Sequence, residues 1–110
     1  MGNSTRPHPR KEMIRRLIVR PEAESELADA YDRYEHLVSG LGTEFLLCVE
    51  AVFNAVVRAP RQFPLINGRA RRALARRFPY EVFFIEDDQR VVILSVFHAR
   101  RNPRRWQERI

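Results

Sequence analysis

The chain has 110 residues, of which 45% are hydrophobic, 31% charged and 10% aromatic. This composition is typical of one folded domain and excludes an intrinsically disordered protein. The single cysteine, Cys48, excludes an internal disulfide and a cysteine-based zinc site, and no apolar run is long enough to span a bilayer. We therefore expect a cytoplasmic protein with one domain over residues 13–110, with no metal and no other cofactor.

The net charge of +6 is distributed unevenly along the chain. Residues 1–57 carry seven basic and nine acidic side chains, whereas residues 58–110 carry thirteen basic and five acidic ones. Clustered like charges repel one another unless a partner neutralises them, so we expect the second half to meet a polyanion or an acidic protein surface. A solvated face that only increases solubility is the alternative.

The first half of the chain predicts a tail, a strand and a helix. Residues 1–12 contain two prolines and no apolar periodicity, which predicts a disordered tail. Residues 14–20 are rich in β-branched and aliphatic side chains and predict a strand. Pro21 and the glutamates after it predict the start of a helix, whose apolar residues recur at spacings of three and four. The acidic residues of this helix are interpreted as a solvated face.

A helical hairpin is predicted next. The segment from Ser39 to Gly42 has the glycines of a helix end, and Thr43 is the expected cap of a second helix over residues 43–59. That helix is apolar almost all round, apart from a stripe at Glu50, Asn54 and Arg58. We therefore expect it to be the better buried of the two helices.

The second half of the chain predicts a loop followed by strands. Pro60 and Pro64 end the helix and predict a loop through Asn67 and Gly68. Strands are expected over residues 69–76, 78–85 and 91–97, the last of them central and covered on both faces. After Asn102 and Pro103 we expect a last helical turn that places Trp106 against the body of the protein.

This order predicts an α+β fold. An N-terminal strand and a helical hairpin are followed by a three-stranded antiparallel meander, and the helices pack on one face of the sheet. Alternation along the strands sends several arginine side chains away from the helices, so a basic concave surface is expected. Its residues are Arg69, Arg71, Arg72, Arg76 and Arg77.

Three stretches of the chain carry a resemblance to a known family. They are VRPEAESELADAYDRYE, the Pro-x-x-Phe-Pro loop after the second helix, and RRFPYEVFFIEDDQRVVILSVFHARRNPRRW. Together they resemble the RelE/ParE superfamily of toxins from bacterial type II toxin-antitoxin modules, over about residues 14–106. The resemblance implies a plasmid stabilisation toxin that inhibits growth and is neutralised by a cognate antitoxin.

The two branches of this superfamily imply different targets. The ParE-like branch poisons DNA gyrase by binding, whereas the RelE-like branch cleaves mRNA on the ribosome, using basic residues and an acid. Here Leu74 and Glu81 stand where the nuclease branch carries basic side chains. We therefore expect gyrase as the target and lean against an enzyme. A ribosome-dependent endonuclease and a non-toxic basic binding module are the alternatives.

Candidate site residues follow from the same stretches. Under the nuclease alternative, the catalytic candidates are Arg72, His98 and Arg100. His98 is also interpreted structurally, as a side chain that bonds backbone where the last strand ends, and Tyr80 as a packed ring with a locally bonded hydroxyl. Guanidinium groups bind carboxylates and phosphates through two points. The residues expected to bind the antitoxin or the target are Arg71, Arg72, Arg76, Arg77, Tyr80, Arg100, Arg101, Arg104 and Arg105.

Overall fold

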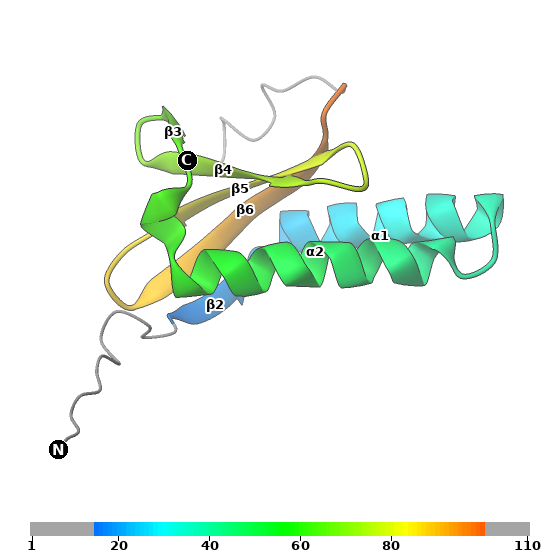
Figure 1. Cartoon of the computed structure of the whole chain (residues 1–110), viewed down its shortest axis with the longest axis horizontal. Helices are drawn as coiled ribbons and strands as arrows, with labels where there is room; N and C mark the ends of the chain where they lie inside the picture. The colour runs from blue at the N-terminus through cyan, green and yellow to red at the C-terminus, as the bar shows by residue number, and fades with distance from the viewer. Residues whose placement is uncertain (1–14, 101–110) are drawn as a thin grey trace, which may run out of the picture.

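The computed structural model describes residues 15–100. Its elements are, in chain order, β2 (Arg16–Val19), α1 (Pro21–Leu37), α2 (Leu41–Arg58), the 3₁₀ helix η2 (Pro60–Gln62), β3 (Leu65–Asn67), β4 (Ala70–Ala75), β5 (Tyr80–Glu86) and β6 (Arg90–His98) (Figure 1). The tail predicted over residues 1–12, the helical turn with Trp106, and the arginines at 101, 104 and 105 lie outside the described residues. In the described part, neither helix is long and apolar enough to cross a membrane.

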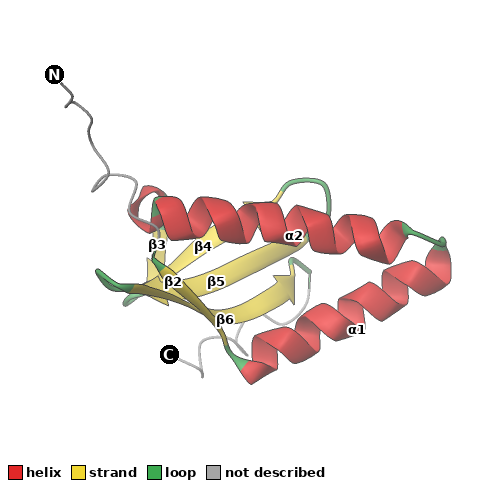
Figure 2. Ribbon diagram, turned by 90° about the horizontal axis from the view of Figure 1, so that it is seen from below, coloured by secondary structure: helices red, strands yellow, loops and turns green. Residues whose placement is uncertain are grey.

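The strands form one five-stranded sheet in the order β2-β6-β5-β4-β3. β2 runs parallel to β6, and the other neighbours are antiparallel. Both helices lie on one face of this sheet (Figure 2). The expected α+β fold, with its helical hairpin and its meander of β4, β5 and β6, is therefore confirmed.

The central position of β6 explains its nearly continuous apolar sequence. β6 lies between β2 and β5, and its residues Val91, Ile93 and Val96 belong to the main core beneath the helices. Phe97 belongs to a smaller cluster with Phe83 and Ala70. A strand that is buried on both faces requires apolar side chains at successive positions, as the sequence predicted.

The turn between the helices is stabilised by a carboxylate of α1. Glu35 accepts hydrogen bonds from the backbone N–H groups of Gly40, at 2.8 Å, and Gly42, at 2.9 Å. Gly40 has a φ of 89°, which glycine adopts without strain. The prediction that Thr43 caps α2 is wrong, because α2 begins at Leu41 and the Glu35 carboxylate already bonds N–H groups at its start.

The loop predicted after the second helix contains regular structure. Pro60 starts η2, and β3 forms a short hairpin with β4 in place of an irregular loop. Gly68 has a φ of 54° in the tight link between these strands. The hairpin was missed because β3 is only three residues long, too short for its side chains to show a period of two.

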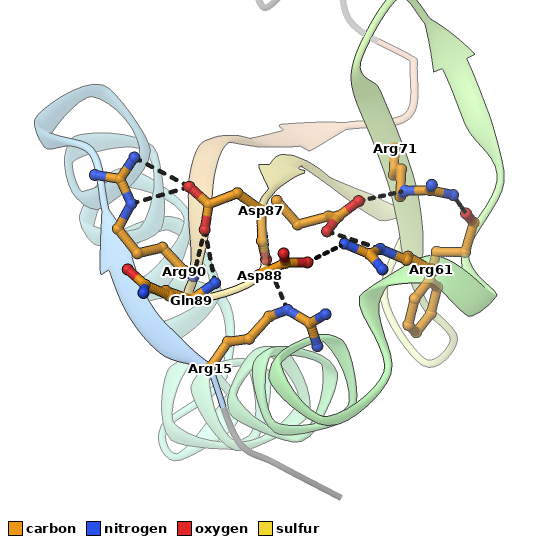
Figure 3. A network of polar contacts seen from close by, with 9 residues as sticks. Arg15, Arg61, Arg71, Asp87, Asp88, Gln89 and Arg90 are labelled. Atoms are coloured by element: carbon orange, nitrogen blue, oxygen red, sulfur yellow. Dashed lines mark hydrogen bonds and ion pairs between the residues drawn. The ribbon is translucent and has the colours of Figure 1, made fainter. Parts of the chain in front are cut away.

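A network of polar contacts holds the link between β5 and β6 (Figure 3). The Asp87 carboxylate accepts hydrogen bonds from the backbone N–H groups of Gln89 and Arg90, both at 2.8 Å, and these bonds lower the pKa of Asp87. Arg61 of η2 donates to Glu86 at 3.2 Å and to Asp88 at 2.8 Å. The network therefore fixes η2 to the β5–β6 hairpin, although the two are far apart in the sequence.

Gly42 provides the first prediction. A Cβ at this position would lie 2.8 Å from the backbone oxygen of Tyr31, so the two helices would have to move apart. We expect Gly42→Ala to lower the free energy of unfolding by about 1–3 kcal/mol, the usual effect of overpacking. Thr43→Ala is the matched control and should change it by less than about 0.5 kcal/mol. Both values are measured by urea denaturation, and a larger loss in the control would restore Thr43 as a cap.

Candidate functional site

A groove of about 1100 Å³ lies between α2 and the outer edge of β4, and we call it the α2–β4 groove. One wall consists of small and apolar side chains of α2, and the other wall comes from β4 and the start of β5. Because alanines stand on both walls, the helix and the strand leave space between them. The lining residues are Cys48, Ala51, Val52, Ala55, Phe63, Pro64, Arg72, Ala73, Leu74, Ala75, Arg76, Phe78, Pro79, Tyr80, Glu81 and Ala99.

The groove is open because β3 covers only the beginning of β4. The pairing of the two strands involves Ala70 and Arg71, and the last bond of the hairpin runs from the Arg72 N–H to the Pro64 carbonyl, at 3.1 Å. Beyond this bond, no other described strand lies beside β4 on that side. The Leu74 side chain is 55% exposed there. Among the described residues, the second half of β4 thus pairs with β5 on one side and has no neighbouring strand on the other.

Two arginines flank this edge. Arg72 and Arg76 line the groove on either side of Leu74, and within residues 15–100 their side chains have no ion pair. Glu81 is the acidic residue of the lining and lies opposite Leu74 on β5, one strand further from the edge. The charge at the edge itself is therefore positive.

Arg71, which precedes Arg72 in the sequence, and Arg77, which follows Arg76, contact other parts of the fold. Arg71 has a side chain that is 16% exposed; it donates to the Phe63 carbonyl at 2.7 Å and lies 3.6 Å from the Glu86 carboxylate (Figure 3). Arg77 forms an ion pair with Glu44. The expected basic surface is therefore divided: Arg72 and Arg76 line the groove, whereas Arg71 and Arg77 contact other parts of the fold.

Tyr80 is a packing residue with a locally bonded hydroxyl, as the sequence suggested. It is 4% exposed, and its hydroxyl oxygen lies 2.6 Å from Nη2 of Arg33, which donates to it. Its ring contacts those of Phe45 and His98, with centroids 4.9 Å and 5.2 Å away. Burial, and then the nearby Tyr80, raise the pKa of Tyr34 above its ordinary value. This end of the groove is thus lined by a buried, packed side chain.

The candidate catalytic residues are not gathered in one cavity. Arg72 lines the α2–β4 groove, whereas His98 lines a separate cavity of about 70 Å³. Nδ1 of His98 accepts a hydrogen bond from the backbone N–H of Arg100 at 3.1 Å, which agrees with its structural interpretation. Arg100 is exposed and lines neither cavity. Among the residues that the structure describes, no cluster of side chains could hold a metal ion.

The sequence analysis did not predict the roles of several residues that line the two cavities or contact their linings. The acidic face of the first helix is not entirely solvated, because the Glu26 carboxylate accepts hydrogen bonds from the Ser95 hydroxyl, at 2.9 Å, and the Val96 N–H, at 3.1 Å. Ser95, a polar residue within an apolar strand, was the available signal. Ala51 and Ala55 gave none, because alanine is common on any helix.

The strand order, the helical hairpin on one face and the half-covered β4 edge define a small α+β protein with a preformed groove. The fold is similar to that of a solved structure titled "Chromosomal ParDE TA system from P. aeruginosa", with a TM-score of 0.69 and 17% sequence identity over 77% of this chain and 96% of that one. A family model described as the ParE toxin of the type II toxin-antitoxin system parDE matches residues 17–103. The chain therefore belongs to the ParE toxin family. No curated protein matches it.

The different contacts of Arg71 and Arg72 predict unequal effects on stability when each is substituted. Arg71→Ala removes a hydrogen bond to the Phe63 carbonyl and should lower the free energy of unfolding by about 1–2 kcal/mol. Arg72→Ala should change it by less than about 0.5 kcal/mol, because this side chain has no ion pair with any other described residue. Urea denaturation of both variants tests this. Equal losses would contradict the division.

Proposed function

We propose that this ParE-family protein is a toxin that inhibits growth by binding DNA gyrase in the cytoplasm, without cleaving a bond itself. The observation that supports it most is the separation of Arg72 from His98, which line different cavities. Proton transfer in catalysis needs its donor and acceptor within hydrogen-bond reach of one reacting group. Arg72 and Arg76 instead offer charge for binding at the edge of an apolar groove.

The endonuclease remains the alternative, and the same separation argues against it. A nuclease of this fold would need a basic and an acidic group on one scissile phosphate. Here His98 contacts Tyr80 and accepts a hydrogen bond from backbone, while Arg72 lies at the β4 edge. Glu81 in the groove would also repel a phosphate.

Gyrase inhibition is tested directly with purified components. We expect the purified chain to inhibit DNA supercoiling by gyrase in a dose-dependent manner, and to leave relaxation by topoisomerase I unchanged. Primer extension on mRNA from cells that express the chain should show no new cuts. Full supercoiling at tenfold molar excess of the chain would contradict the proposal, and cuts that disappear with His98→Ala would favour the endonuclease.

We further propose that a cognate antitoxin neutralises the protein by binding in the α2–β4 groove. The groove has apolar walls of small residues, and arginines flank it, which suits a segment with apolar and acidic side chains. A bound ligand stabilises the folded state by mass action, so the antitoxin should also raise the melting temperature.

The groove can be filled by substitution. Ala55 lines the groove and Asn54, its neighbour on α2, does not, although both are exposed. We expect Ala55→Trp to weaken antitoxin binding at least tenfold in calorimetry, about 1.4 kcal/mol. Co-expressed antitoxin should then fail to restore growth. Asn54→Trp, the matched control, should be neutralised like the unmodified chain. Equal rescue of both variants would place the antitoxin elsewhere.

A further inference from the structure

A second apolar cluster lies on the face of the sheet that turns away from the helices, which we call the outer face. Side chains alternate between the two faces along a strand. The neighbours of Phe83 in the sequence, Val82 and Phe84, belong to the main core beneath the helices, so Phe83 points to the outer face. The cluster consists of three buried residues and two half-buried ones that pack against them: Ala70, Phe83, Phe97, Ile66 and Ile85.

The described helices and strands do not account for the burial of this cluster. Phe83 and Phe97 are only 2% and 4% exposed. Both long helices lie on the other face (Figure 2), and η2 leads into Phe63, which packs against the main core. The side chains on an uncovered face of an antiparallel sheet are in contact with water. The burial of the two rings therefore requires a cover from outside residues 15–100.

We propose that residues 101–110 lie across the outer face and place Trp106 over Phe83 and Phe97. β6 ends at His98, directly after Phe97, so the chain leaves the sheet beside the cluster. Phe83 pairs with Ser95, only two positions before Phe97 along β6. The six residues from Arg100 to Trp106 can reach about 20 Å, so the indole can lie on both rings. A tryptophan buries about 150–250 Å², which suits a cover for two aromatic side chains.

The N-terminal residues start from the other end of the sheet. Arg16 pairs with Arg90, the first residue of β6, which lies about 23 Å from Phe97 at the usual rise of a strand. Residues 1–12 contain no Phe, Tyr or Trp. The C-terminal segment is therefore the better match to an aromatic cluster. Trp106 lies beyond residues 17–103, which the family model matches, so the contact is inferred from this chain alone.

The charge of the outer face also suits this segment. Glu81 pairs with Phe97, and alternation along β5 places it on the same face as Phe83. Within residues 15–100 the Glu81 carboxylate forms no ion pair. Arg104 and Arg105 directly precede Trp106, so a segment that places the indole on Phe97 brings a guanidinium group to this carboxylate.

Trp106 is the single tryptophan of the chain, so its fluorescence reports on this contact alone. We expect the emission of the folded full chain to be blue-shifted from its value in urea, and acrylamide to quench it at least threefold more slowly. Phe83→Leu and Phe97→Leu should each shift the emission to the red and speed the quenching. Phe53→Leu, the matched control in the main core, should change neither. Emission equal to that of the unfolded chain, or equal effects of the three substitutions, would overturn the proposal.

A second copy of the chain is the alternative cover, and the protein concentration separates the two. A cover from the same chain is intramolecular, so the quenching should stay constant over a hundredfold range of concentration while light scattering shows a monomer. Trp106→Ala should lower the melting temperature by about 10 °C or more. Gln107→Ala, the matched control, should lower it by less than about 2 °C. Protection that increases with concentration, or equal shifts of the two variants, would overturn the proposal.

A double-mutant cycle tests the charge contact. Glu81→Arg should lower the melting temperature more in the unmodified chain than in the double variant Arg104→Ala and Arg105→Ala, which lacks the opposing guanidinium groups. Glu50→Arg, on the exposed side of α2, is the matched control and should have the same effect in both. Equal losses for Glu81→Arg in both backgrounds would overturn the charge contact. These measurements use no gyrase and no antitoxin, so their outcome is independent of the proposed function.

Discussion

Contacts among four aromatic rings hold the helices against the sheet. The ring of Tyr34 on α1 lies 5.0 Å from that of Phe78, and Phe45 on α2 lies 4.9 Å from Tyr80. Such pairs contribute about 0.5–1.5 kcal/mol each beyond the area that they bury. Because Phe78 and Tyr80 also line the groove, the same contacts set the distance between α2 and β4 at that end. The shape of the α2–β4 groove at this end is therefore a consequence of core packing.

Most elements could be predicted from the sequence, including the four-residue strand β2, whereas η2 and β3 could not. Pro21 marked the start of α1, and the apolar run of β6 indicated a central strand, because each signal is local. β3 was missed because it forms only through its pairing with β4. The error at Thr43 has a related cause. The carboxylate at the turn comes from Glu35 in the preceding helix, outside the segment where a cap is sought.

The candidate site was predictable as a charge pattern but not as a geometry. Arg71 and Arg72 are adjacent residues of the same type. Arg71 nevertheless contacts Phe63 and Glu86, whereas Arg72 lines the groove. Strand alternation gives them opposite faces, but only the tertiary fold brings Glu86 beside Arg71. The alternation itself was readable. The sequence could not show which residues of the same chain would lie against each face of the strand.

Pro64 has a consequence for how the sheet is completed. In an antiparallel hairpin, the residues before β3 would lie beside the second half of β4 if the pairing of the two strands were extended. Proline cannot donate the next bond, and η2 turns the chain away immediately before it. Proline and η2 thus act together as a stop that keeps the segment before β3 from extending its pairing along the second half of β4.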